Sequence, residues 1–424
     1  MTTTNNTWLN ENKQDIILKF VAFLVSPILG LFVAILRPNT KSSYIVLFLA
    51  FLSIGLSINV PYESLEEAEF DSSVYRRDFE SFCAANSADF RDTIREYRDM
   101  EGSTDIYSSV LFYIVSLVTN NYHVCFMVIA LIFSIFMLKS WRFFIAEPNY
   151  RTTFVCLLLL FLFSICQIQK INAFRFYTAY WIALYAIFNI IQANKKGFWT
   201  LLCLTPLVHA SFIIIIIIML IYYMMQSNHK LSVGIVIVSI IFSPFAVDVL
   251  SWAIMHLPES LGGHYSAYIN EWYIKKVNSG TGLIWTVRLM ELLVRLSVNA
   301  IVLFFAWKYH THIANSKCNK LYFLLLTILA FVNFTFTIPS LGSRFVMFAF
   351  PLIAYIWLIC FMNENTYNRF IVGFTVLYLL YFLFLPWNIY QIPCFKYYTQ
   401  LWNADIIYQS PVYLWIKYIL FPPA

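Results

Sequence analysis

The sequence predicts an all-α, polytopic membrane protein, and three features of its composition and pattern support this. Hydrophobic residues make up 60% of the 424 residues and charged residues only 12%, a balance outside the range of soluble globular domains. Apolar runs close to the ~20 residues that cross a bilayer core recur along nearly the whole length. Basic residues stand in short loops between these runs, as topogenic charge does. We therefore expect roughly ten to twelve transmembrane helices in one membrane domain, residues 1–424.

The first apolar run, residues 16–36, leads directly into a basic turn at Arg37 and Lys41 and then a second run. It lacks the small-residue exit of a cleaved signal peptide, so we expect it to remain as a span. The positive-inside rule places this turn in the cytoplasm. Three further basic turns belong on the same side: residues 139–151, 195–196 and 308–320.

Residues 61–105 have the opposite charge balance. They hold thirteen acidic residues against five arginines, and we expect them to form a large periplasmic loop. A second outer loop is expected at residues 251–283, and residues 387–424 form a tail rich in Tyr and Trp, as at a membrane interface. The net charge of +6 comes from short loops, so we expect no nucleic-acid partner.

The apolar block at residues 197–230 is too long for one straight crossing. A helix of its 34 residues would extend about 51 Å, whereas a bilayer core is ~30 Å thick. One crossing would also place the basic turn at 308–320 outside. Two half-passes solve both difficulties, with a break near Pro206, which removes a backbone hydrogen bond. His209 then lies at the outer apex of a re-entrant hairpin, a structure tolerated where it lines a water-filled cavity.

Two polar side chains, Arg175 and His209, stand inside apolar sequence. Such groups are expensive at membrane depth and persist where they face a cavity, a partner or a substrate. Arg344 opens a later span at its outer end. The alternative interpretations are an Arg175 that reaches lipid headgroups, a His209 that is a satisfied polar residue between helices, and an Arg344 that is an interfacial anchor.

The span at residues 284–307 carries three more charges, Arg288, Glu291 and Arg295. Their spacing places them on one helical face. They form either part of a substrate site or a salt-bridge ladder inside the protein.

Several short motifs resemble those of the Wzy-type polysaccharide polymerases, specifically their EpsG-like branch. An arginine followed by a small residue, a basic turn and a His-x-Ser motif are matched by Arg175 with Ala179, Lys195-Lys196, and His209 with Ser211. The Asp-x-x-x-Tyr pattern of the first outer loop and the late arginine are matched by Asp71, Tyr75 and Arg344. The resemblance covers about residues 44–361. It departs from the family pattern at Phe176, where Gln or a similar residue often follows the arginine.

The resemblance implies a GT-C-like glycosyltransferase that joins oligosaccharide repeat units at the periplasmic face of a bacterial inner membrane. Donor and acceptor are both carried on undecaprenyl diphosphate, and no cofactor or metal is expected. The implied partners are these lipid-linked units, the bilayer and a separate chain-length regulator. The product is an O-antigen, a capsule or an exopolysaccharide.

This chemistry suits the candidate residues. Arginine is a permanently charged, bidentate donor for a diphosphate leaving group, a role we expect for Arg175 and Arg344, with Arg288 third. Histidine suits a general base, hence His209. The rival bases are Asp71 and Glu291. The residues expected to bind substrate are Asp71, Tyr75, Arg288, Glu291 and Arg295.

Two rival functions remain open at this point. The first is a metal-dependent GT-C transferase that uses a polyprenyl-phosphate sugar, with the acidic loop around Glu66, Glu67 and Glu69 as its metal site. The second is a flippase or transporter for lipid-linked oligosaccharides, which would need paired broken helices in two related halves. A membrane acyltransferase is a weaker rival that rests on the buried histidine alone.

Overall fold

The fold is known from a computed structural model, in which the regular elements of the described residues are helices. The described residues are 8–60, 71–84, 87–99, 105–164, 173–225, 228–256, 284–338, 341–388 and 405–422. Four helical segments within them are long and apolar enough to cross a membrane: Tyr122–Ile145, Phe174–Ile191, Asn319–Thr337 and Gly342–Cys360. A fifth is added if His229–Ile241 and Ser243–Met255, bent by 64°, form one span. The prediction of an all-α, polytopic membrane protein is confirmed.

In the part of the chain that the structure describes, several of the predicted apolar runs are divided into shorter helices. The run at 16–36 forms two helices, α1 (Lys13–Val25) and α2 (Pro27–Leu36). Ser26 separates them: its side chain accepts a hydrogen bond from the N–H of Leu29 at 3.3 Å. Pro27 occupies the first turn of α2, where its missing N–H costs nothing. Other short apolar helices are α3 (Lys41–Leu56), α6 (Tyr107–Ser116) and α8 (Phe154–Ser164).

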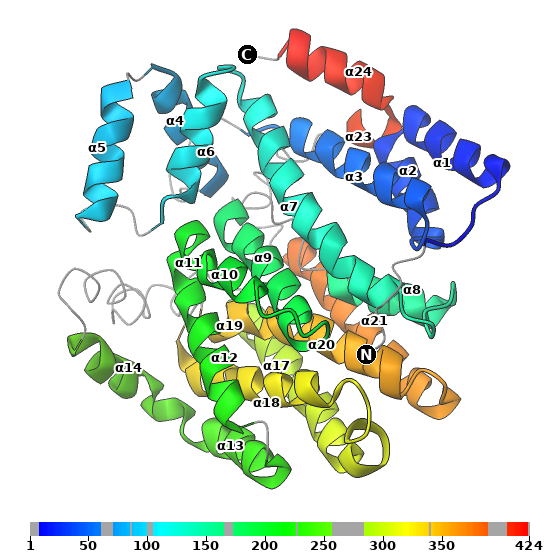
Figure 1. Cartoon of the computed structure of the whole chain (residues 1–424), viewed down its shortest axis with the longest axis vertical. Coiled ribbons are helices and arrows are strands. Elements are labelled where there is room, and N and C mark those ends of the chain that lie inside the picture. The colour runs from blue at the N-terminus through cyan, green and yellow to red at the C-terminus, as the bar shows by residue number, and fades with distance from the viewer. Residues whose placement is uncertain are drawn as a thin grey trace.

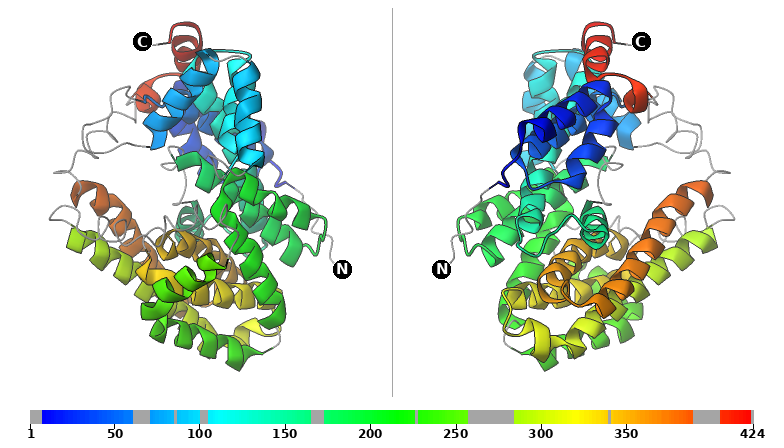
Figure 2. Two further views of the ribbon diagram at one scale, coloured as in Figure 1. Left: turned by 90° about the vertical axis from the view of Figure 1, so that its left-hand side faces the viewer. Right: turned by 90° about the vertical axis from the view of Figure 1, so that its right-hand side faces the viewer.

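The helices gather in two groups around a central one (Figure 1). The first group contains α1 to α7, with α7 (Tyr122–Ile145) running diagonally across the molecule. The second contains the later helices: α13 (His229–Ile241), α14 (Ala246–Met255), α17 (Ile284–Trp307), α18 (Asn319–Phe334), α20 (Ala349–Cys360) and α21 (Asn365–Asn388). Within it, α17 packs against α21 (Figure 2). Between the groups lies α9 (Phe174–Ile191), which packs on α7.

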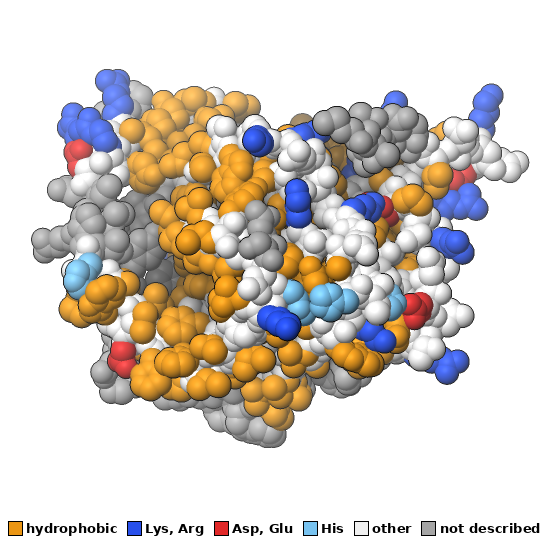
Figure 3. All heavy atoms as spheres, turned by 60° about the horizontal axis from the view of Figure 1, so that its bottom comes forward, with side chains coloured by type: hydrophobic (Ala, Val, Ile, Leu, Met, Phe, Trp, Pro, Cys, Tyr) orange, Lys and Arg blue, Asp and Glu red, His pale blue; other side chains and the backbone are white. Residues whose placement is uncertain are grey.

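Helix α9 is largely apolar and almost wholly buried, as expected of a helix in the centre of a bundle. Its buried Tyr180 donates a hydrogen bond to the carbonyl oxygen of Met347 at 3.2 Å. This bond ties α9 to the second group of helices. The outer surface differs, because exposed hydrophobic side chains are widespread there and basic side chains stand among them (Figure 3). Such a surface fits a protein surrounded by lipid.

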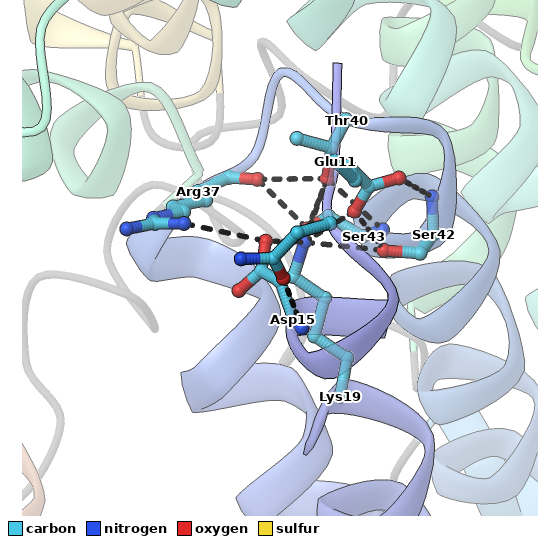
Figure 4. Close-up of polar contacts among 8 residues, drawn as sticks. Glu11, Asp15, Lys19, Arg37, Thr40, Ser42 and Ser43 are labelled. Carbon is cyan, nitrogen blue, oxygen red and sulfur yellow. Dashed lines mark hydrogen bonds and ion pairs between the residues drawn. The ribbon is translucent and has the colours of Figure 1, made fainter. Parts of the chain in front are cut away.

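A polar cluster holds the N-terminal segment against the first basic turn (Figure 4). The ammonium group of Lys19, only 1% exposed, contacts Glu11 at 2.6 Å, Thr40 at 2.9 Å and Ser42 at 3.1 Å. Burial alone would raise the pKa of Glu11, but its hydrogen bonds with Lys19 and Ser42 outweigh this and lower the pKa to about 2. The turn predicted as topogenic charge is therefore also part of a buried ionic contact.

The acidic segment expected as a loop contains two helices, α4 (Asp71–Ala84) and α5 (Ser87–Arg98). Arg76 fixes α4: it pairs with Glu80 at 2.8 Å, donates to the carbonyl oxygen of Val60 at 2.6 Å, and lies 4.0 Å from the Tyr122 ring centre. The acidic residues Glu63, Glu66, Glu67 and Glu69 lie outside the described residues, as do positions 257–283 of the second outer loop.

The aromatic tail packs back on the N-terminal helices (Figure 1). It contains α23 (Asp405–Tyr408), α24 (Pro411–Trp415) and the single turn η8 (Ile416–Leu420). The indole N–H of Trp415 donates to Ser53 Oγ at 3.1 Å, and Ser26 Oγ donates to the carbonyl oxygen of Ile406 at 3.2 Å. The two ends of the chain thus form one packed unit.

Candidate functional site

A helical hairpin follows α9, at the position where the sequence predicted a broken or re-entrant helix. Its rising arm is α10 (Phe198–Cys203) and α11 (Thr205–Val208), and its returning arm is the short turn η2 (Ala210–Phe212) and α12 (Ile213–Met225). Helix α10 packs on α12, and the rings of Trp199 and Tyr223 lie 5.9 Å apart. In one continuous helix these residues would be about 36 Å apart. Pro206 lies in the first turn of α11.

His209 forms the apex of the hairpin. Its backbone is extended, with φ −156° and ψ 117°, so helical hydrogen bonding stops there. The imidazole Nδ1 accepts a hydrogen bond from the N–H of Ser211 at 3.3 Å and lies 2.8 Å from Ser211 Oγ. His209 therefore caps the start of the returning arm. Because Nδ1 is an acceptor, a neutral imidazole carries its proton on Nε2.

Arg175 lies in the first turn of α9 and is held by two other segments. Its Nη1 lies 3.2 Å from each carboxylate oxygen of Asp105, and its Nε lies 3.2 Å from the Tyr75 hydroxyl. Tyr75 comes from α4, and Asp105 lies immediately before α6. The side chain of Asp105 is 3% exposed and that of Arg175 is 31% exposed. The structure thus brings together Arg175 and Tyr75, both selected from sequence, and adds Asp105 as their partner.

Asp105 lies beside the apex of the hairpin. The N–H of the next residue, Ile106, donates to the carbonyl oxygen of Leu207 at 3.2 Å. Burial raises the pKa of Asp105, and the charge of Arg175 opposes that shift. Sequence reasoning missed this residue among thirteen acids. Its signal was position, because it is the last acid before the apolar run that begins at Ile106.

Arg344 reaches the same place from α19 (Gly342–Phe345). Its guanidinium lies 5.6 Å from the Phe176 ring centre, within the range of a cation–π contact, and that ring lies 5.3 Å from the His209 ring. Arg344 and Arg175 are both near enough to His209 to act on its imidazole electrostatically. Phe176, where the sequence departs from the expected pattern, therefore contacts both Arg344 and His209.

A close approach of two helices fixes the position of Arg344. A side chain on Gly342 would bring its Cβ within 3.0 Å of the backbone of Phe336 and Val332. Contacts shorter than about 3.0 Å are rarely tolerated. The absence of a side chain at Gly342 therefore lets α19 lie directly against the end of α18. Glycine is the residue that permits such approach.

The remaining predicted residues are spread over two helices. Arg295 donates to the side chain and the carbonyl oxygen of Asn333, each at 3.0 Å, and stacks on Phe336 at 4.0 Å. These contacts join α17 to α18. Glu291 is half-buried on α17. Asp71 begins α4 and Arg288 belongs to α17, but both side chains lie outside the described part of the structure.

Among the residues that the structure describes, no group of three or more His, Cys, Asp or Glu side chains is arranged to hold a metal ion. The metal-dependent alternative rests on the acidic loop around Glu66, Glu67 and Glu69, which lies outside that part. Arg175, Arg344, His209 and Asp105 instead form a site of positive charge, one imidazole and one buried carboxylate. Such a set can bind a phosphate group and handle one proton.

The model of the EpsG family matches residues 45–399, a range that contains all of the site described above. Neither the curated proteins nor the solved structures contain a significant match.

Proposed function

The chain belongs to the EpsG family of polysaccharide-polymerase-type membrane proteins, and we propose that it joins oligosaccharide repeat units carried on undecaprenyl diphosphate. The growing glycan is the donor, its lipid diphosphate is the leaving group, and a hydroxyl of the next lipid-linked unit is the acceptor. The reaction takes place at the periplasmic face of a bacterial inner membrane. The observation that carries the proposal is the convergence of Arg175, Arg344, His209 and Asp105 at the apex of the hairpin.

The two arginines stabilise the departing diphosphate. Asp105 contacts Nη1 of Arg175, and Tyr75 contacts its Nε. No partner for Nη2 is found among the described residues. That nitrogen is available to a phosphate oxygen. Arg344 approaches from the other side of Phe176 and supplies the second charge. A preorganised donor placed where negative charge develops contributes about 3 kcal/mol to transition-state stabilisation.

His209 supports the same charge. With its proton on Nε2, the neutral imidazole donates a hydrogen bond to a phosphate oxygen. To act as the general base instead, it would first release its hydrogen bond from the Ser211 N–H. This geometry favours His209 as a donor and a carboxylate as the base.

Asp105 is the carboxylate best placed for the base. Its raised pKa makes it a better proton acceptor than an ordinary aspartate. A diphosphate that binds Arg175 competes with Asp105 for the guanidinium, so donor binding weakens this ion pair and lets the carboxylate approach the acceptor hydroxyl. Asp71 and Glu291 remain alternative bases.

The test is polymerisation by the purified full-length protein in nanodiscs. Cognate lipid-diphosphate-linked repeat units are supplied with EDTA, and the glycans and the released undecaprenyl diphosphate are measured. A ladder of longer glycans, with one lipid diphosphate released for each unit added, supports the proposal. Activity that returns only with Mg²⁺ or Mn²⁺ would indicate the metal-dependent transferase. Movement of intact units across the bilayer without elongation would indicate the flippase.

A further inference from the structure

A cavity of about 300 Å³ lies at the base of the re-entrant hairpin. Its walls are aromatic and aliphatic: Trp199 of α10, Tyr222 and Tyr223 of α12, and two isoleucines at the end of α9. Lys196 and Lys320 provide its charge, and Asn194 adds an amide. The volume is at the lower end of the range of small-molecule sites.

This cavity is separate from the site at the apex. Arg175 lies in the first turn of α9 and Ile190 in its last turn, so the two sites are about 22 Å apart along the helix. The arms of the hairpin separate them in the same way, because His209 is at the apex whereas Trp199 and Tyr223 meet at the base. The reaction proposed above uses none of the residues that line the cavity.

Local structure fixes the position of both lysines. Asn194 adopts a positive φ of 52°, and the N–H of Lys195 donates to the carbonyl oxygen of Asn189 at 2.9 Å. This is the turn that ends helices by a left-handed residue, and it directs the chain at Lys196 from α9 into α10. Gln192 donates to the carbonyl oxygen of Lys317 at 3.2 Å, which holds the start of α18, and with it Lys320, against the end of α9.

The lining has the chemistry of a lipid phosphate site. Two lysines line one small volume, and none of the other described residues that line it is acidic, so the cavity favours an anion. The rings and isoleucines beside them favour an apolar chain. Basic pockets between transmembrane helices bind anionic lipid headgroups in this way, and Trp and Tyr mark the headgroup level.

We propose that this cavity binds the phosphate group of an anionic lipid, with Lys196 and Lys320 on the phosphate and Trp199, Tyr222 and Tyr223 beside the first part of its chain. The occupant is a membrane lipid phosphate, either a phospholipid or a polyprenyl phosphate. The lipid rests between the two arms at the base of the hairpin. The proposal stands whether or not the apex site is a polymerase.

The test is native mass spectrometry of the full-length protein with three probes: phosphatidylglycerol, undecaprenyl phosphate and soluble glycerol 3-phosphate, each against phosphatidylcholine. The variants are Lys196→Gln, Lys320→Gln and their combination. Lys195→Gln is the matched control, because this lysine adjoins Lys196 but does not line the cavity. We expect each lining substitution to weaken retention of an anionic lipid about fivefold, and the control to have little effect.

The probes also separate the two sources of lipid phosphate, since the better-retained lipid identifies the occupant. Lys196→Arg combined with Lys320→Arg, which keeps both charges, should preserve binding. If Lys195→Gln and Lys196→Gln weaken retention of the anionic lipid equally, the proposal is overturned, because the lipid is then held only by general charge attraction. Equal retention of soluble glycerol 3-phosphate would overturn the role of the apolar wall.

Discussion

Arg175 could be selected from the sequence, but its partners are known only from the structure. A lone charge in apolar sequence identified it as a candidate, and the structure gives it Tyr75 and Asp105 as partners. The contact with Asp105 could not be predicted, because 70 residues separate the two and twelve other acids were equally eligible. The local sequence shows which side chain is costly to bury. Which other side chain pairs with it depends on tertiary packing.

At the same scale, we predict that Asp105→Asn lowers the polymerisation rate by about 10²- to 10⁴-fold, the range for loss of a general base. The carboxylate is active only when deprotonated, and burial raises its pKa above the ordinary 3.8. Wild-type activity should therefore fall as the pH is lowered towards that raised pKa. The pH–rate profile of the folded variant, in which this acidic limb disappears, is the measurement. An unchanged profile and rate would exclude Asp105 as the base.

The N-terminal cluster supplies a second prediction about a residue. The pKa of Glu11 is lowered from 4.5 to about 2, so its carboxylate stabilises the folded state above pH 4.5. That contribution is lost as the pH falls from 4.5 towards 2. We expect Glu11→Gln to cost about 1.5–3 kcal/mol at pH 7, typical of a lost charged hydrogen bond, and less at pH 3.

Thermal unfolding of Glu11→Gln in detergent at both pH values provides the measurement. Glu364→Gln is the control, because Glu364 forms an exposed pair with His312, and such pairs contribute little. A larger loss of stability at pH 3 than at pH 7 would contradict the assignment.

Among the elements, the hairpin could be predicted from length and loop charge alone. A 34-residue apolar block cannot cross once, and Pro206 indicated where it would break. The break itself came a little later, at His209, because the proline fits the first turn of α11 while His209 caps the next turn with its own side chain. Side-chain capping of this kind depends on geometry that the sequence pattern does not contain.

We predict that Trp199→Cys and Tyr223→Cys, combined with Cys203→Ser, are joined by a short thiol crosslinker. Their native rings lie 5.9 Å apart, so the two arms are within reach. Trp199→Cys paired with Ala210→Cys is the control, since those positions lie at opposite ends of the hairpin. Crosslinking measured as a peptide adduct should occur only in the first pair. Its absence there, in folded protein, would contradict the hairpin.

For the whole molecule, composition was enough to predict the class and too little to predict the packing. Apolar content indicated a membrane protein, but it did not predict that the first apolar run divides at Ser26 into α1 and α2. The tail was predicted as an interfacial belt, and its contact between Trp415 and Ser53 joins residues 362 apart. Periodicity and hydropathy describe each segment alone, so such long-range contacts lie beyond them.

Orientation is a further prediction about the whole molecule. The charge pattern places α5 outside and the turn at 195–196 inside. A cysteine at Arg95, which is 71% exposed, should react with an impermeant maleimide in intact spheroplasts, whereas a cysteine at Lys195 should react only after permeabilisation. The reverse pattern would invert the topology and place the apex site on the cytoplasmic side.

The most direct test of the central claim is the polymerisation rate of Arg175→Ala and Arg344→Ala. Both should slow elongation by about 100-fold, equivalent to about 3 kcal/mol of lost transition-state stabilisation. Arg151→Ala, which removes an exposed arginine outside the site, should elongate at the wild-type rate. Folded Arg175→Ala and Arg344→Ala proteins that elongate as fast as Arg151→Ala would show that this pair of arginines does not carry the reaction.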